Sequence, residues 1–450
     1  MRFAVVGAGI TGLVAAHRLR AAGATVTVYE SSERIGGKLR TAALEAATPG
    51  SSTPGDSALD LGAESFLARR PEAVRLAGEL GLEVVHPGPA RAVIRAGGAE
   101  HPIPAGTVMG VPATREAVRE IVELTEEPAE PAAIGPQTTV GGLLRARLGD
   151  QVVDRLVDPL LAGVYAGRAD ALGLRATMPG LAEAIEQHGS VLAAAAALLP
   201  ANPSSAPVFG AVRGGYRALT EALDRDVRTG TTVHALSRNR SGWRLGIGGH
   251  GSAEYAEADG VVLAVPAPAA AKLLAEVAPE AARGYAGIEL ASMAVLGFAY
   301  PETVPLPERS GILLASGERR ADGTPFTAKA VTFSSRKWPH LPPGLLRASV
   351  GRFGEEELLR GTDGTLIEAV RADLAELTGI TAEPAAVRVQ RWGGGLPQYG
   401  PGHLERVQRI EAAVAAVPGL AVAGATLHGV GVPACIATAD AAAQRLLAVG

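Results

Sequence analysis

The strongest constraint on the fold is a glycine-rich segment that follows the first apolar run of the chain. Residues 2–6 have the composition of a buried parallel strand, and Gly7-Ala8-Gly9-Ile10-Thr11-Gly12 comes directly after them. Residues 13–22 then carry apolar side chains at helical spacing and stop at Gly23, a residue type that commonly ends helices. Residues 24–30 alternate and are rich in β-branched side chains, which favours a second strand. The pattern predicts a strand, a tight turn, a helix and a second strand.

Each glycine of this turn has a mechanical reason in the binding of a dinucleotide. Gly7 permits the tight turn, Gly9 lets the backbone approach a pyrophosphate, and Gly12 lets the helix lie close to the strand. The helix N-terminus offers unpaired amides and a partial positive charge to the phosphates. Glu30 ends the second strand, where its carboxylate can accept from ribose hydroxyls. We therefore predict a dinucleotide site, with a glycine turn that binds no ligand as the alternative; the predicted site residues are Gly7, Ala8, Gly9, Ile10, Thr11, Gly12 and Glu30.

The composition of the chain limits its domain number, its binding partners and its location. The chain has 450 residues and a net charge of −4, which predicts two or three domains and argues against a nucleic-acid partner. The single cysteine, Cys435, excludes a disulfide framework within the chain and is expected to be a small packed side chain. No cluster of His, Asp and Glu has metal-ligand spacing, so we expect no metal. We expect neither a signal peptide nor a transmembrane segment, which predicts a cytoplasmic location.

The residues after Glu30 resemble the extended motif of the amine-oxidase-like flavoproteins, which carry Arg-x-Gly-Gly after the ribose acid. Here the motif is Ser31-Ser-Glu-Arg34-Ile-Gly36-Gly37-Lys38, and a second block, Asp60-Leu-Gly62-Ala63-Glu64-Ser65, follows. The resemblance implies FAD as the cofactor, with the first block beside its phosphates and flavin and the second beside the isoalloxazine ring. It also implies an adenine-contacting valine at Val233. The FAD-binding residues implied in this way are Ser31, Arg34, Gly36, Gly37, Lys38, Gly62, Ala63, Glu64, Ser65, Val233, Trp392, Gly424, Val430, Gly431 and Val432.

Two later segments are expected to return to the same site. Residues 258–264 and 419–424 each have the pattern of a short strand, and a helix is predicted from about 434 to 447. The N-terminus of that helix, with its small residues, is suited to a ring carbonyl, and its expected target is the flavin edge. Residues 43–58 are rich in Pro, Gly and Ser and predict an exposed loop, and residues 199–207 predict a hinge.

A central segment narrows the family further. Leu156-Val-Asp-Pro159-Leu-Leu-Ala-Gly163-Val-Tyr165-Ala-Gly167 resembles the signature of the protoporphyrinogen and coproporphyrinogen oxidases. Matching blocks follow in order along nearly the whole chain, including Lys337-Trp338-Pro339-His340 and Pro397-Gln-Tyr399. The pattern is similar to the Gram-positive members that act on coproporphyrinogen III. The resemblance implies hydride transfer from the porphyrinogen to FAD, oxygen as acceptor, hydrogen peroxide as product, and a place in haem biosynthesis.

Substrate identity should show in charge, because coproporphyrinogen carries four propionates and protoporphyrinogen only two. Ala63 and Glu64 stand where relatives often have Pro and Asp, and Arg70 where relatives can carry a lysine, so the detailed substrate contacts differ. Lys329 is favoured as a propionate ligand because it interrupts an apolar strand. Arg69, Arg336 and Lys337 are either further ligands or solvated, and no residue is identified as a catalytic base. The predicted substrate-binding residues are Arg70, Gly163, Tyr165 and Lys329.

The predicted architecture is α/β, with an α+β substrate region. A discontinuous Rossmann-like FAD domain is expected from residues 1–70, 205–265 and 385–450, a helical domain from 71–204, and a mixed-sheet substrate domain from 266–384. The alternatives are a protoporphyrinogen IX oxidase, another amine-oxidase-like oxidase or desaturase, and a non-catalytic flavoprotein or tetrapyrrole carrier. The sequence leaves open a transient contact with the next haem-pathway enzyme and a peripheral contact with a membrane.

Overall fold

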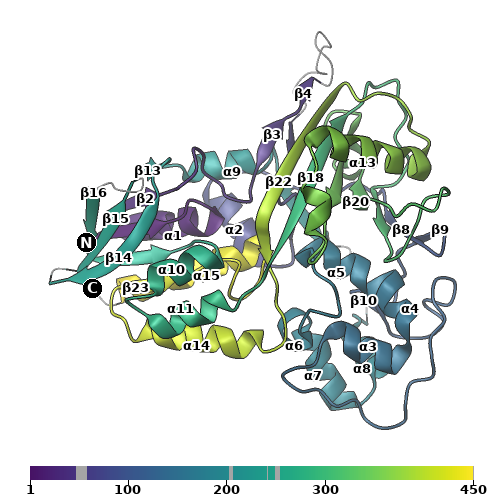
Figure 1. Ribbon diagram of the computed structural model, residues 1–450, viewed down its shortest axis with the longest axis horizontal. Helices are drawn as coiled ribbons and strands as arrows, with labels where there is room; N and C mark the ends of the chain where they lie inside the picture. Colours follow the sequence, from purple (N-terminus) through teal and green to yellow (C-terminus); the bar gives the residue numbers. More distant parts are fainter. Residues whose placement is uncertain (47–57, 202–205, 241, 249–253, 449–450) are drawn as a thin grey trace.

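A parallel sheet with its covering helices lies at one end of the molecule, and a large antiparallel sheet lies at the other above a group of helices (Figure 1). The structure is a computed structural model that describes residues 1–46, 58–201, 206–240, 242–248 and 254–448. Both chain ends lie beside the parallel sheet, so the chain leaves this region and returns to it. Two long strands, β18 (Leu290–Ala299) and β22 (Ala386–Pro397), lie where the two parts meet.

The parallel sheet draws its five strands from three separate stretches of the chain, as the sequence predicts. All neighbouring pairs are parallel, and the N-terminal strand lies in the middle. The expected strands near 258–264 and 419–424 are thereby confirmed, although both are shorter than predicted. The strand order is β13 (Val227–Arg228), β2 (Thr25–Tyr29), β1 (Arg2–Val6), β17 (Gly260–Leu263) and β23 (Leu420–Val422).

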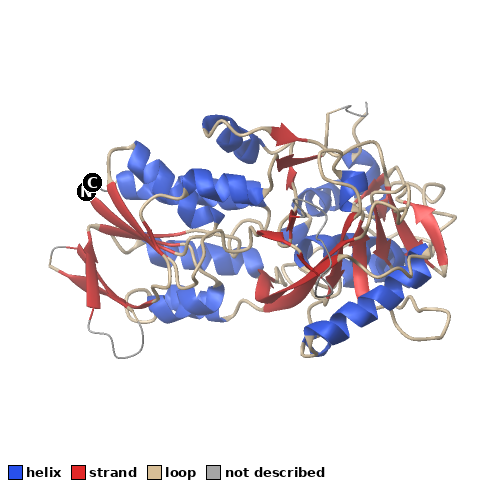
Figure 2. Ribbon diagram, turned by 90° about the horizontal axis from the view of Figure 1, so that it is seen from above, coloured by secondary structure: helices blue, strands red, loops and turns tan. Residues whose placement is uncertain are grey.

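Both faces of this sheet are covered, which explains why β1 from Phe3 onward, β17 and β23 are continuously apolar. Phe3 and Val5 face a core that they share with four helices, whereas Ala4 and Val6 face a second core on the other side. Figure 2 shows helices on both sides of the strands. The first face carries α1 (Ile10–Ala21), α2 (Pro71–Glu79), α9 (Tyr216–Leu223) and α15 (Val432–Leu447). The second carries α10 (Ala267–Leu274), α11 (Pro279–Ala286), α14 (His403–Ala415) and the sheet of β14 (Val233–Asn239), β15 (Gly242–Ile247) and β16 (Glu254–Ala258).

The large sheet has eight strands within the described residues and is mostly antiparallel. Alternate apolar residues of its central strands pack against α13 (Asp363–Thr378), which leaves the opposite face directed toward the helical region and the parallel sheet. Its order is β4 (Glu45–Ala46), β22, β18, β21 (Leu345–Val350), β20 (Ala328–Thr332), β19 (Gly311–Leu314), β8 (Ala92–Ala96) and β9 (Ala99–Pro102).

The apolar core of the helical region includes Ile94 and Ala96 of β8, and the region packs against the large sheet through α5 (Asp158–Tyr165) and the turn that precedes it. α5 contacts β19 and β20 and is preceded by a π-helical turn at Val153–Val157. π-Turns are rare and occur frequently at functional sites. The other helices are α3 (Val140–Leu148), α4 (Asp150–Val152), α6 (Leu174–Thr177), α7 (Pro179–His188) and α8 (Val191–Leu198).

Several segments lie elsewhere than the predicted domain boundaries put them. Residues 386–397, assigned to the cofactor region, form β22 of the large sheet, because their register follows β18. Residues 92–102, assigned to the helical region, form β8 and β9 of the same sheet. α2 packs on α1 and α15 instead of on the helical region. The three-part division itself stays a proposal, with these segments reassigned.

The predicted loop at 43–58 is wrong at its ends. Residues 41–43 pair with 58–60 as β3 (Thr41–Ala43) and β5 (Ala58–Asp60), and β4 joins the large sheet. Residues 47–57 of that prediction, and residues 202–205 of the predicted hinge, lie outside the described residues.

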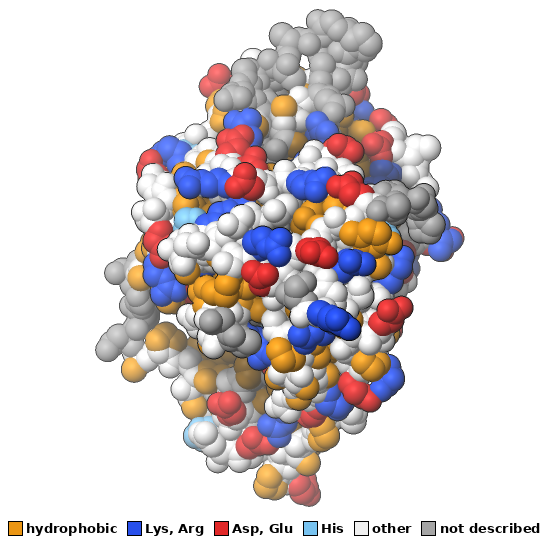
Figure 3. All heavy atoms as spheres, turned by 90° about the vertical axis from the view of Figure 1, so that its left-hand side faces the viewer, with side chains coloured by type: hydrophobic (Ala, Val, Ile, Leu, Met, Phe, Trp, Pro, Cys, Tyr) orange, Lys and Arg blue, Asp and Glu red, His pale blue; other side chains and the backbone are white. Residues whose placement is uncertain are grey.

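Two further features concern the charges on the surface and the length of the helices. Basic and acidic side chains alternate over the face shown in Figure 3, as the near-balanced composition predicts. Among the helices that the structure describes, none has the length and apolar character needed to cross a membrane.

Replacement of Gly12 tests the close approach of α1 to β1. A Cβ at Gly12 would collide with the carbonyl oxygen of Gly7, so Gly12→Ala must push the helix away from the strand. We expect a loss of about 2 kcal/mol or more, seen as a melting temperature lower by several degrees in circular dichroism. Gly78→Ala in α2 is the matched control, because no atom lies within 4 Å of its added Cβ. The control should be neutral or slightly stabilising; an equal loss in both variants would contradict the packing argument.

Candidate cofactor and active site

The glycine turn is built as the sequence predicts, and one of its glycines faces open space. Gly7 adopts φ +99°, and a Cβ there would collide with the carbonyl of Ala264 at the end of β17. Gly12 is closed off by the Gly7 carbonyl. Gly9, by contrast, has no atom within 4 Å of its added Cβ, and its amide has no partner among the described residues. A backbone cradle that is packed from behind and open in front of the helix N-terminus suits a pyrophosphate.

Glu30 lies beside this turn and organises it. Its Oε2 accepts the amide of Ala8 at 2.8 Å, and its Oε1 accepts the amide and hydroxyl of Ser32 at 2.9 and 2.8 Å. The Thr231 amide donates to the Glu30 carbonyl at 2.8 Å, which brings Val233, at the buried start of β14, to the same strand end. The predicted ribose acid and the predicted adenine-contacting valine therefore lie at one edge of the sheet.

A second glycine turn lies against the first. The Gly36 amide donates to the Ala8 carbonyl at 2.7 Å, and the added Cβ of Gly37 would lie 3.1 Å from the Gly9 Cα. Arg34 holds this turn by donating to the carbonyls of Ile35 and Gly37 at 3.1 and 2.9 Å. The two motifs thus form one surface of backbone, although 24 or more residues separate their glycines in the sequence.

The predicted flavin-adjacent block spans residues 60–65, and its residues 60–64 lie between this second turn and the large sheet. On one side the Ala63 amide donates to the Lys38 carbonyl at 3.2 Å, and a Cβ at Gly62 would collide with that carbonyl. On the other side Trp392 of β22 donates its indole Nε1–H to the Leu61 carbonyl at 2.8 Å. The Trp392 ring also lies 5.8 Å from the guanidinium of Arg34. Trp392 therefore contacts both predicted cofactor blocks.

Glu64 forms a largely buried ion pair across the same junction. Its carboxylate lies 2.7 Å from the Lys337 ammonium, with side chains 15% and 20% exposed. Burial pushes the pKa of Glu64 up, but the Lys337 and Arg347 charges outweigh burial and hold this pKa below its ordinary value. Lys337 also lies over the rings of Phe209 and Trp338. The Lys337 ammonium therefore pairs with a carboxylate of the protein itself, whereas the sequence predicted that Lys337 is either a substrate ligand or solvated.

The predicted C-terminal cofactor segment is held by Tyr399, which follows β22, and by the start of α14. Tyr399 donates its hydroxyl to the Ala425 carbonyl at 2.6 Å and accepts the Gly429 amide at 2.7 Å. His403 stacks on Tyr399 at 3.8 Å between ring centroids. Burial lowers the pKa of His403 to about 4, so the neutral ring donates from Nε2 to the Leu427 carbonyl at 3.1 Å.

The loop ahead of α15 presents free amides, as a binding role requires. Gly424 adopts φ +129° and donates to the Thr438 hydroxyl at 3.0 Å. The amides of Val430 and Gly431 have no partner among the described residues, and Gly431 is the N-cap ahead of Val432. These amides and the N-terminus of α15 form a positive surface that suits a ring carbonyl.

Two side chains close to this surface have shifted pKa values. Burial raises the pKa of the Cys435 thiol to about 11, which makes this residue an inert packed side chain, as expected. Burial lowers the pKa of Lys38, and its ammonium has no hydrogen-bond partner among the described residues. His428, in contrast, is exposed and pairs with Glu411.

The predicted substrate residues lie in two places. Gly163 and Tyr165 end α5, with open space at Gly163, and the Tyr165 carbonyl accepts from Gln398 at 2.9 Å. Burial raises the pKa of Tyr165 to about 12, and its ring lies 5.6 Å from that of Tyr399. Arg70 instead caps α2 near the surface and pairs with Glu72 at 2.8 Å. No described contact brings Arg70 to α5 or to the large sheet.

Lys329, the predicted propionate ligand that interrupts an apolar strand, lies within β20 and is buried. It sits at an irregular point in the pairing of β20 with β21, is 7% exposed, and donates from Nζ to the Gly351 carbonyl at 2.7 Å. Burial, with a smaller effect of Arg352, lowers its pKa to about 7. Bulges commonly redirect a side chain next to a functional site.

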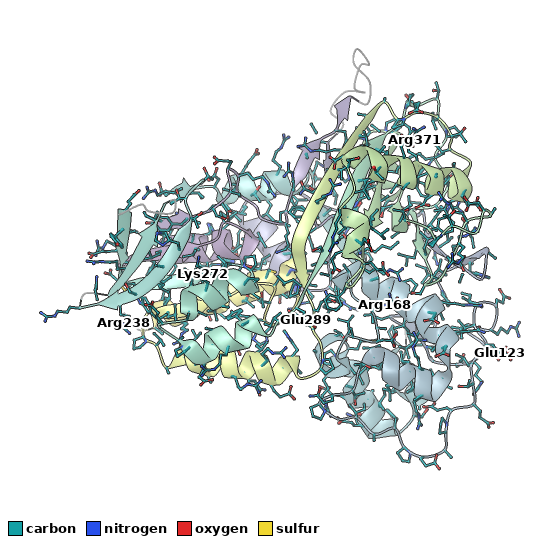
Figure 4. All side chains as sticks on the ribbon, in the orientation of Figure 1. Glu123, Arg168, Arg238, Lys272, Glu289 and Arg371 are labelled. Carbon is teal, nitrogen blue, oxygen red and sulfur yellow. The ribbon has the colours of Figure 1, made fainter. Side chains whose placement is uncertain are left out.

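A buried charge network lies beside Lys329, where α5 meets the sheet. Arg352 donates to Asp158 at 3.0 Å and to the hydroxyl of Ser316 at 2.8 Å. At the exposed margin of this network, Arg168, labelled in Figure 4, pairs with Glu355 at 3.1 Å. Together these contacts fix α5 against the strands that carry Lys329.

Sequence analysis missed Arg347, Tyr399 and His403 as residues of the site. Arg347 interrupts the apolar strand Leu345–Val350 in the same way that Lys329 interrupts its own strand. A basic residue within an apolar strand was therefore a signal that could have identified Arg347, but it was applied only to Lys329. Tyr399 belongs to a block that was recognised only as a resemblance. Its partners follow it by 26 and 30 residues, which no local pattern reveals.

Comparisons with known proteins agree with this geometry. Residues 10–447 match the family described as flavin containing amine oxidoreductase. A protein of Mycobacterium tuberculosis named coproporphyrinogen III oxidase is 40% identical over 99% of this chain and 97% of its own length. A Bacillus subtilis protein of the same name is 30% identical over 98% of this chain and 97% of its own. A crystal structure from Exiguobacterium sp. 255-15, assigned as a protoporphyrinogen oxidase, superposes with a TM-score of 0.81 at 32% identity and covers 98% of both chains.

Removal of Lys337 tests the pair with Glu64. Lys337→Met leaves a carboxylate largely buried without its nearest counter-ion, so we expect a loss of about 2 kcal/mol at pH 7. The folded pKa of Glu64 lies below its ordinary 4.5, so the pair's contribution is complete above that pH and is lost as the pH falls through the folded pKa. Thermal unfolding at pH 7 and at pH 4 should therefore differ less in the variant than in the wild type.

The control for this experiment is Arg213→Met. Arg213 pairs with Glu83 at 2.6 Å, but both side chains are more than half exposed. An exposed pair contributes little, so this variant should leave the unfolding midpoint nearly unchanged. A Lys337 variant as stable as this control would show that Glu64 does not depend on its partner.

Proposed function

The chain belongs to the family of flavin containing amine oxidoreductases, and from that premise we propose that it is an FAD-dependent oxidase of coproporphyrinogen III. The observation that carries the proposal is the junction at residues 60–64, where one backbone segment contacts both the dinucleotide turn and the large sheet. Relatives named for this activity match end to end, so both sides of the junction are included in the likeness.

FAD is the flavin that fits the length of the predicted site. The described backbone cradles run from the end of β2 through both glycine turns to residues 60–64 and the loop ahead of α15. A mononucleotide would leave the turn at Gly9 or the loop at Gly431 without a ligand group. When bound, FAD supplies a ring that accepts a hydride, and the protein supplies position and exclusion of water.

The residues of the chain have separate tasks in this proposal. The N-terminus of α1 and the open Gly9 hold the pyrophosphate, and Glu30 accepts from the ribose. The amides of Val430 and Gly431, which have no partner among the described residues, would be available to the flavin ring. No described side chain is assigned as a base, so we assign the loss of protons to the pyrrole nitrogens of the substrate itself.

The substrate is proposed to lie between the large sheet and the end of α5. Gly163 leaves open space there, and Tyr165 supplies an aromatic wall. Lys329 is proposed to bind a propionate, because a charged ammonium has three N–H donors and the structure describes one acceptor for it. Oxygen as acceptor, peroxide as product, a cytoplasmic location and a transient contact with the next haem-pathway enzyme belong to the same proposal.

One assay tests the activity. Colourless coproporphyrinogen III, prepared anaerobically, is mixed in air with the flavin-loaded protein, and porphyrin fluorescence and peroxide are followed together. The proposal expects three molecules of hydrogen peroxide per porphyrin. Six electrons and six hydrogens leave the substrate, and each oxygen molecule takes up two electrons and two hydrogens. Porphyrin binding without oxygen consumption would favour a carrier instead.

Protoporphyrinogen IX is the second candidate substrate. The structure from Exiguobacterium, assigned to that activity, shares 32% identity and the whole fold with this chain. The same assay with protoporphyrinogen IX decides between them, and a higher kcat/KM for coproporphyrinogen III is expected because it carries two more propionates.

The role of Lys329 has a pH signature. Because the pKa of Lys329 is about 7, its ammonium is present below that pH and lost above it. KM for coproporphyrinogen III should therefore rise about tenfold between pH 6 and pH 9 if one propionate depends on this charge. Lys329→Met should raise KM at pH 6 and remove the pH dependence.

Lys272→Met provides the control for the Lys329 variant. Lys272 lies on α10, far from the large sheet in Figure 4, and should leave KM unchanged at both pH values. A Lys329→Met enzyme that keeps the wild-type KM profile would remove Lys329 from the substrate site.

A further inference from the structure

Three consecutive backbone carbonyls beside the proposed flavin site are each held by a side chain of the large sheet. Arg347 donates from Nη1 to the Asp60 carbonyl at 2.7 Å and from Nη2 to the Gly62 carbonyl at 3.1 Å. Trp392 donates to the carbonyl between them, that of Leu61, at 2.8 Å. The segment that borders the predicted ring is therefore tied to two strands of the sheet, β21 and β22.

The contacts of Arg347 with this segment are buried and do not lie on the protein surface. Arg347 is 9% exposed and lies in a strand whose other residues are mostly apolar and buried. A guanidinium presents its donors in a fixed planar fork, so two carbonyls held by one fork are fixed relative to each other. If the fork were lost, two carbonyls in a largely buried junction would lose their hydrogen-bond donor, which makes this conformation of the segment less favourable.

The segment also has no freedom on its other side. Gly62 is pressed against the Lys38 carbonyl so closely that no Cβ fits, and the Ala63 amide donates to the same carbonyl. The ion pair of Glu64 with Lys337 closes the end of the segment. Residues 60–64 can therefore shift only if the contacts with the sheet or the contacts with the second glycine turn give way.

We propose that Arg347 is a positioning residue: its fork fixes residues 60–62 in the conformation that meets the flavin ring, and so sets the ring relative to the substrate sheet. The inference rests on the proposed function, in which residues 62–65 border the flavin. Arg347 contacts backbone in the structure and acts on the reaction through that segment. Displacement of reacting groups by about 1 Å can cost about a hundredfold in rate, so a positioning role has a measurable consequence.

Arg347→Met and Arg347→Lys test the proposal. Hydrogen exchange of the amides in 58–67 should be at least about tenfold faster in Arg347→Met, with or without added FAD, because the segment opens more easily. The visible absorption of bound flavin should lose its fine structure. In turnover, kcat should fall about tenfold or more with a smaller change in KM. Arg347→Lys, which keeps one donor group but not the fork, should recover only part of each effect.

Arg147→Met is the matched control. Arg147 is also buried, at 8% exposure, and donates to the carbonyls of Pro128 and Glu130 at 3.0 and 2.7 Å in the helical region. It should lower thermal stability without changing exchange in 58–67 or the flavin spectrum.

The outcomes separate this inference from the proposed function. Wild-type exchange and flavin spectrum in Arg347→Met, or the same changes in Arg147→Met, would overturn the positioning role. A wild-type protein that binds FAD but does not oxidise coproporphyrinogen III would contradict the proposed substrate instead, while exchange and absorption would still report on Arg347. If Arg347→Met does not fold, Arg347→Lys must show the predicted changes for the proposal to stand.

Discussion

Contact of backbone with backbone at Gly12 and Gly62 is the constraint on which the structure depends. At Gly12 the first helix touches the turn that starts it, and at Gly62 the second cofactor block touches the Lys38 carbonyl. Neither position has room for a Cβ, so each approach requires glycine. The first contact forms the glycine turn that is predicted to bind the dinucleotide, and the second places the neighbouring block against the second glycine turn.

The two parts of the molecule are joined by charges that are mostly buried. The pair of Glu64 with Lys337, the fork of Arg347 and the pair of Asp158 with Arg352 all lie where the large sheet meets a neighbouring layer. Buried ion pairs add little net stability, but removal of one partner leaves an uncompensated charge. These contacts specify how the large sheet lies against the neighbouring layers, because any other docking of the sheet would bury these charges without a partner. The proposed binding of a flavin and a macrocycle by different layers would require such a fixed relation.

Local patterns predicted the cofactor half well because its information is local. The turn, both of its flanking strands and the C-terminal helix follow from glycine spacing and apolar periodicity within about 15 residues. The large sheet was harder to predict, because β22 pairs with β18 across 87 to 107 positions and β8 pairs with β19 across more than 200. Strand composition does not identify a partner at such separations, so residues 92–102 and 386–397 were assigned to other regions.

The sequence alone determined the dinucleotide turn, the acid at Glu30 and the likeness to a porphyrinogen-oxidising family, because these depend on residue type and spacing. Only the tertiary structure decided which basic side chains are already paired with groups of the protein itself. Lys337 meets Glu64 across 273 positions, Arg347 meets Asp60 across 287, and Arg70 stays near the surface with Glu72. The reason is that the charge state and availability of a cation depend on its burial and its partner, and both are set by contacts that no stretch of sequence contains.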